Sequence, residues 1–96
     1  MRFPNPLGEE DLDWMGRIIG DFPDAIGGMD GLSWGTDVSG RAQGYQFGLV
    51  VRFRDAAAAE AYQVHPRHQE LVQWIRARGG QVLAFDFPTP EHAGPR

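Results

Sequence analysis

The chain contains no cysteine and no lysine. The absence of cysteine excludes a disulfide framework, a thiolate nucleophile and a cysteine-ligated metal site. All nine basic residues are arginines, they are scattered along the sequence, and the net charge is −4. Such a chain lacks the basic patch that nucleic-acid binding requires, so no nucleic-acid partner is expected.

Long hydrophobic runs are also missing. No apolar stretch is long enough to cross a bilayer, and the first residues, Met1 to Pro4, lack the apolar core of a signal peptide. We therefore expect a cytoplasmic protein with no membrane partner.

Length and composition predict one small domain. The chain has 96 residues, of which 42% are apolar, enough for one modest core. Because so small a domain buries a limited share of its surface, a dimer is expected to bury more. We assign residues 1–88 to the domain. The proline-containing polar residues 89–96 are expected to be a disordered tail.

Apolar periodicity predicts helices and strands in alternation. Residues 8–20 are expected to form a helix whose core face carries Leu12, Met15, Ile19 and Phe22 at helical spacing, and Pro23 with Gly27 and Gly28 closes that segment. Alternating side chains predict strands over residues 32–39 and 45–54, joined by a turn, and a last strand over residues 81–87.

Two further helices are expected between the second and last of these strands. Asp55 is a suitable N-cap for the alanine-rich helix that runs to about Val64. The residue before a proline avoids the helical region, so His65 marks a break, and Pro66 suits the first turn of a new helix. Gly79 and Gly80 end that helix.

This order predicts an α+β, ferredoxin-like βαββαβ domain with an antiparallel sheet and a truncated first strand. In that topology the first strand is central, and Met1 to Phe3 could supply only its end. The sheet should therefore have a gap. We expect the native start of the chain to lie upstream of Met1.

The segment from Tyr62 to His68 carries the residues best suited to chemistry. A tyrosine and a histidine held together can act as oxyanion donor and general base, but the same residues can simply end one helix and start another. His65 is interpreted as a helix cap. His65 and His68 have a spacing that could chelate a metal, but Pro66 separates them and no third ligand is evident, so no metal site is expected.

Three stretches together resemble one known family. They are residues 34–39 followed by Gly44 and Tyr45, the Tyr-x-x-His-Pro-x-His pattern of residues 62–68, and the apolar strand of residues 82–87. Over about Met1 to Pro88 the chain resembles the stress-responsive α/β-barrel (Dabb) family. The resemblance implies a homodimeric α/β barrel in which two four-stranded sheets face each other. It also implies a small apolar ligand pocket between helices and sheet, with no cofactor. Plausible wall residues are Met15, Ile18, Trp34, Phe47, Leu49 and Leu71, with His65 as a neighbour.

The same resemblance suggests a possible activity. One branch of the family is similar to plant polyketide cyclases, which close a poly-β-ketone by intramolecular aldol condensation. By motif position, His68 would be the base and Tyr62 would hold the developing enolate oxygen. Family members commonly carry a histidine on the first strand, and this chain has none there. We therefore rank a ligand-binding, stress-related dimer first and a cofactor-independent cyclase second. A heme- or oxygen-using monooxygenase, which would want an axial histidine, ranks third.

Overall fold

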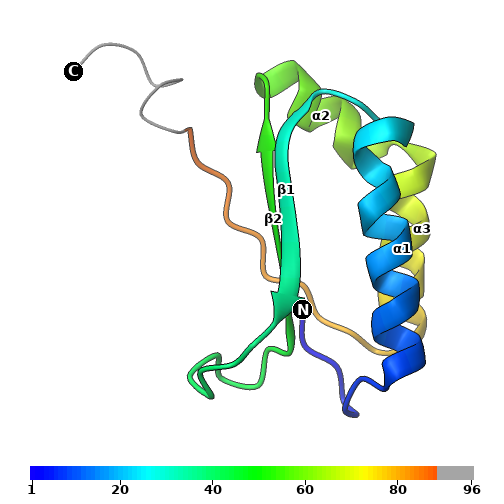
Figure 1. Cartoon of the computed structure of the whole chain (residues 1–96), viewed down its shortest axis with the longest axis vertical. Coiled ribbons are helices and arrows are strands. Elements are labelled where there is room, and N and C mark those ends of the chain that lie inside the picture. The colour runs from blue at the N-terminus through cyan, green and yellow to red at the C-terminus, as the bar shows by residue number, and fades with distance from the viewer. Residues whose placement is uncertain (89–96) are drawn as a thin grey trace.

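Three helices cover one face of a two-stranded antiparallel sheet (Figure 1). The computed structural model describes residues 1–88. The elements, in chain order, are α1 (Glu9–Ala25), β1 (Met29–Thr36), β2 (Phe47–Phe53), α2 (Ala56–Val64) and α3 (Pro66–Ala77). The predicted α+β class is confirmed, and the predicted tail, residues 89–96, lies outside the described residues.

Helix α1 is longer than the sequence predicts. Acidic residues occupy its first turn, where the positive end of the helix dipole favours them, and the Asp11 carboxylate accepts a hydrogen bond from the Gly8 N–H at 3.3 Å. The helix continues through Pro23, which cannot donate a hydrogen bond to the Ile19 carbonyl, and ends two residues later at Ala25. It ends before Gly27 and Gly28, whose positive φ angles of 78° and 73° leave the helical region.

The two strands begin and end at different residues from those expected. Strand β1 starts three residues earlier than predicted and pairs with β2 from Met29 opposite Phe53 to Thr36 opposite Phe47. The predicted alternation in β2 is confirmed: Phe47 is buried against the helices, whereas Val50 points to the other face and is 68% exposed.

The helix break at His65 is confirmed. The Asp55 carboxylate caps α2 by accepting from the Ala58 N–H at 2.8 Å. His65 has an extended conformation (φ −68°, ψ 135°), and Pro66 is the first residue of α3. Gly79, at φ 69°, follows the end of that helix.

The predicted last strand is wrong for this chain. Within residues 1–88, the segment from 82 to 88 forms neither a helix nor a strand, and only Gln81 makes a bridge, to Arg2. On the other side of that bridge Met1 exchanges backbone hydrogen bonds with Phe47. The expected gap in the sheet is thus present. Only Met1 and Arg2 lie between β2 and Gln81, so residues 82–87 have no neighbouring strand among residues 1–88.

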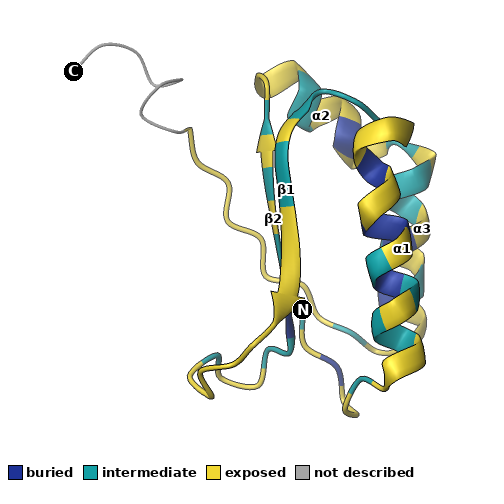
Figure 2. Ribbon diagram, viewed as in Figure 1, coloured by how far each residue is buried: buried dark blue, intermediate teal, exposed yellow. Residues whose placement is uncertain are grey.

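The core lies between the helices and the sheet (Figure 2). Its nine buried side chains come from every element except β1 and include one residue of the N-terminal segment. They are Phe3, Met15, Ile18, Ile19, Phe22, Phe47, Tyr62, Leu71 and Ile75. Among residues 1–88, no helix has both the length and the apolar character needed to cross a membrane.

Candidate functional site

Tyr62 lies on the buried side of α2 with only 6% of its surface exposed. Its ring packs against Phe22 of α1 and Phe53 of β2, at centroid distances of 5.8 and 5.1 Å. No hydrogen bond within residues 1–88 involves its hydroxyl group. Burial raises the pKa of Tyr62 to about 12. The phenol therefore stays protonated at neutral pH and keeps an O–H to donate.

His68 lies in the first turn of α3, half-buried beside Tyr62. The two ring centroids are 4.0 Å apart and the ring planes are inclined by 35°. The Nδ1 atom is 3.4 Å from the Gln63 carbonyl oxygen. Burial lowers the pKa of His68 below its usual value, and the nearby Gln63 carbonyl opposes that shift only in part.

Together these two residues present a neutral imidazole and a protonated phenol at neutral pH. A neutral imidazole can take a proton, and a buried phenol can donate to an oxygen that gains negative charge. The arrangement is therefore chemically suited to removing a proton beside a carbonyl group. It needs no metal for that step.

The predicted wall residues divide between the core and its edge. Met15, Ile18, Phe47 and Leu71 are buried in the same cluster as Tyr62. Leu49 is partly buried against that cluster. Trp34 is 44% exposed, and its indole ring lies over α1 at Gly16 and Gly20, where glycine leaves room for it. These residues thus lie on the helix-facing side of the sheet, and their role as ligand contacts stays a prediction.

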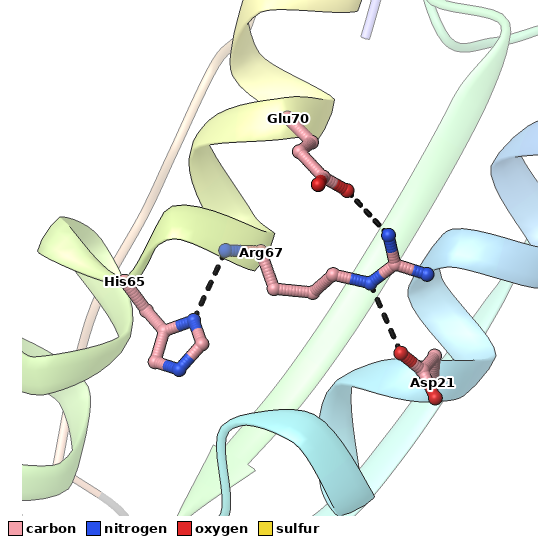
Figure 3. A network of polar contacts seen from close by, with 4 residues as sticks. All are labelled: Asp21, His65, Arg67 and Glu70. Carbon is pink, nitrogen blue, oxygen red and sulfur yellow. Dashed lines mark hydrogen bonds and ion pairs between the residues drawn. The ribbon is translucent and has the colours of Figure 1, made fainter.

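His65 acts as the N-cap of α3, as interpreted from the sequence. Its Nδ1 atom accepts a hydrogen bond from the Arg67 N–H at 3.0 Å (Figure 3). The Arg67 guanidinium group in turn binds Asp21 of α1 at 3.0 Å and also binds Glu70. This network ties the start of α3 to α1 and fixes the helix turn that carries His68.

A second group of side chains occupies the outer surface of the helices, which sequence reasoning did not select as a site. Trp14 and Trp74 stack with centroids 4.8 Å apart, and the Arg78 guanidinium lies 3.9 Å above the Trp74 ring. They line part of a shallow hollow of about 340 Å³. Trp14 and Trp74 are 60 positions apart, so no local sequence pattern could reveal their contact.

The geometry of the domain has clear parallels among known proteins. Residues 3–89 match the family model described as "Stress responsive A/B Barrel Domain". No curated protein matches the chain.

Several solved structures are similar to it, including the following two. The protein At3g17210 from Arabidopsis thaliana superposes with a TM-score of 0.65 at 24% identity, covering 79% of this chain and 76% of that one. The hydroxynitrile lyase from Passiflora edulis gives a TM-score of 0.67 at 20% identity, covering 80% and 75%. At these identities the likeness shows a shared fold.

Proposed function

The chain belongs to the stress-responsive A/B barrel domain family, and from this premise we propose that it is a homodimer that binds a small, largely apolar carbonyl compound beside Tyr62. The observation that carries the proposal is that Tyr62 is only 6% exposed and that its hydroxyl group has no hydrogen-bond partner among residues 1–88. A buried polar group without a partner is costly, so natural proteins rarely keep one unless a ligand or water satisfies it. A ligand carbonyl oxygen would accept its hydrogen bond.

His68, whose ring lies beside that of Tyr62, favours a ligand that is apolar overall. Its lowered pKa keeps the imidazole uncharged, and the surrounding side chains of Phe22, Phe53 and Leu71 are hydrocarbon. Apolar walls with one or two directed polar groups are the usual make-up of a small-molecule site.

The sheet face turned away from the helices supports the dimer. Val50 lies on that face and is 68% exposed, and the segment that follows Gln81 exposes Leu83, Phe85 and Phe87 by 67% or more. Large apolar side chains that are exposed in this way favour a contact surface. A second copy of the chain, placed face to face, would bury them.

Ligand binding is tested with a panel of aromatic and aliphatic ketones and their matched hydrocarbons, by thermal shift and calorimetry. We expect ketones to raise the melting temperature of the wild-type protein and to bind Tyr62→Phe about tenfold less tightly, because one directed hydrogen bond is lost. Unchanged affinity in Tyr62→Phe would contradict the assigned role of the hydroxyl. The matched control is Tyr45→Phe, which removes the only other tyrosine hydroxyl of the chain.

The dimer is tested by light scattering at micromolar concentration. Val50→Asp should give a folded monomer, because it places a charge in the apolar contact. Arg17→Asp on the helix side is the control and should remain dimeric. A wild-type protein that is monomeric under these conditions would refute the dimer.

A second candidate is a cofactor-independent aldol cyclase, and the contact between Tyr62 and His68 favours it. His68 Nε2 would take the proton from a carbon between two carbonyl groups, while the Tyr62 O–H donates to the enolate oxygen. The enolate carbon would then attack a second carbonyl of the same substrate, and the alkoxide that forms would take the proton back from His68. One structure of this fold is a hydroxynitrile lyase, so the fold is compatible with lyase chemistry.

The two candidates differ in turnover. A cyclase should convert a linear poly-β-ketone to a cyclic product, detectable by mass spectrometry after loss of water. His68→Gln should abolish conversion while leaving ketone binding within about threefold of wild type. Binding without any product in the wild-type protein would exclude the cyclase and leave the binding protein.

A further inference from the structure

The broken end of α2 leaves a backbone acceptor without a helical donor. In a continuous helix the Gln63 carbonyl group would accept from the N–H of Arg67, four residues later. That N–H donates instead to His65 Nδ1, at 3.0 Å. Two side chains of α3 take its place at the Gln63 carbonyl oxygen. His68 Nδ1 lies 3.4 Å from that oxygen, and the side-chain amide of Gln69 donates to it at 2.6 Å.

This carbonyl group determines which nitrogen of His68 carries the proton. Burial lowers the pKa of His68, so at neutral pH the ring is uncharged and holds one proton, either on Nδ1 or on Nε2. Because a carbonyl oxygen can only accept, the contact with Gln63 requires the proton on Nδ1. The lone pair is then on Nε2, which makes no hydrogen bond within residues 1–88. Nε2 is therefore the atom that stays free to accept from a ligand.

His65 has the opposite arrangement. Its Nδ1 atom accepts a hydrogen bond from the Arg67 N–H, so its proton is on Nε2. The same chain break thus places two histidines, three residues apart, in opposite tautomers. His65 provides an internal reference against which the tautomer of His68 can be measured.

Gln69 is fixed on both sides of the break. Its backbone N–H donates to the His65 carbonyl group at 3.0 Å, and its half-buried side chain reaches back to the Gln63 carbonyl group. The side-chain amide therefore ties the last turn of α2 to the first turn of α3. Without this tie the Gln63 carbonyl group would be free to turn to water, because the last carbonyl groups of a helix have no helical partner.

We propose that Gln69 is a positioning residue of the site beside Tyr62: by holding the Gln63 carbonyl group, it keeps His68 in the Nδ1–H tautomer. The inference rests on the proposed function and deepens it, because it assigns Nε2 as the accepting atom and names the residue that maintains this assignment. In the other tautomer Nε2 would carry the proton and could take none from a ligand. Holding an imidazole base in the correct tautomer is a recognised task of the group that binds its second nitrogen.

The test is long-range proton–nitrogen nuclear magnetic resonance of the 96-residue protein at pH 8, which distinguishes a protonated ring nitrogen from one that carries a lone pair. His65→Asn and His68→Gln assign the signals by removing one ring at a time. We expect the proton on Nδ1 in His68 and on Nε2 in His65.

Two variants of α3 then test the role of Gln69. Gln69→Met keeps the length of the side chain and removes its donor. The ratio of the Nδ1–H to the Nε2–H form of His68 should fall by about fivefold, as expected for the loss of one hydrogen bond. The matched control is Gln73→Met, one turn further along the helix. Gln73 is exposed and makes no side-chain hydrogen bond in the described part of the chain, so the ratio should not change.

The outcomes separate this proposal from the proposed function. A proton on Nε2 of His68 in the wild-type protein would overturn the proposal, whether or not ketones bind. An unchanged ratio in Gln69→Met would overturn the role assigned to Gln69. If both measurements turn out as expected and no ketone binds, the positioning role of Gln69 stands and the proposed ligand is wrong.

Discussion

The ring centroids of Tyr62 and His68 are only 4.0 Å apart, although the two residues belong to different helices. The chain break at His65 brings them together. In one continuous helix, residues six positions apart would point in different directions, because they are separated by more than one and a half turns. The extended conformation of His65 redirects the chain, so that the first turn of α3 packs back on the last turn of α2.

This contact separates the structural role of the Tyr62 ring from that of its hydroxyl. We predict that Tyr62→Phe changes the free energy of unfolding by less than about 1 kcal/mol, because the hydroxyl has no partner within residues 1–88 and its removal leaves none unpaired. Tyr62→Ala should cost about 3 kcal/mol or more, because it empties space between Phe22 and Phe53. Urea denaturation measures both. A large loss in Tyr62→Phe would reveal a hydrogen bond that keeps the hydroxyl satisfied.

The buried imidazole of His68 predicts a pH dependence. Its pKa in the folded protein lies below the value of about 6.5 expected in the unfolded chain. The unfolded chain therefore binds the proton more readily between these two values. The stability contributed by neutral His68 is full above pH 6.5 and is lost as pH falls through that value toward the folded pKa.

The measurement is the midpoint of urea unfolding between pH 4 and 8, for wild type and His68→Gln. The wild-type midpoint should fall more steeply below pH 6.5 than that of the variant, which lacks the titrating ring. Nuclear magnetic resonance titration of the His68 ring gives the folded pKa directly. A value above 6.5 would show that the imidazole is not desolvated as the structure indicates.

His65 should act on stability through one hydrogen bond. We predict that His65→Ala lowers the free energy of unfolding by about 1 kcal/mol, because the Arg67 N–H loses its acceptor. His65→Asn is the matched control and should retain most of the stability, since asparagine is a good N-cap. If both variants lose the same amount, the imidazole acts by packing rather than by capping. Chemical denaturation distinguishes the two cases.

The sequence predicted correctly those parts of the fold that depend on the conformational preferences of single residues. Asp55, His65 and Pro66 lie where their capping and conformational preferences place them, and the α2–α3 break followed from them. The ends of β1 could not be predicted in the same way. They depend on pairing with β2, which is a contact between distant residues.

The segment from Val82 to Phe87 shows most clearly where prediction from the sequence pattern fails. Its composition is that of a strand, but a strand requires a neighbour with free backbone groups, and among residues 1–88 this segment is bordered by such a neighbour only at Arg2, opposite Gln81. The sequence also could not show that the Tyr62 hydroxyl lacks a hydrogen-bond partner within residues 1–88. The motif identified Tyr62 and His68 as a pair, but only the packing of Phe22 and Phe53 shows that the phenol is buried.

The turn between α1 and β1 provides the last prediction. Gly27 and Gly28 both have positive φ angles, but a side chain at Gly27 would meet open space, whereas a Cβ atom at Gly28 would lie 2.8 Å from the Ala58 Cβ atom. Gly27→Ala should therefore cost about 1–2 kcal/mol, the price of a left-handed residue that is not glycine. Gly28→Ala should cost more, because it adds a clash that moves α2 away from the turn. Thermal unfolding of the two variants measures the difference. Equal losses would show that α2 shifts freely at Ala58, and hence that Tyr62 is held by its ring contacts rather than by the position of its helix.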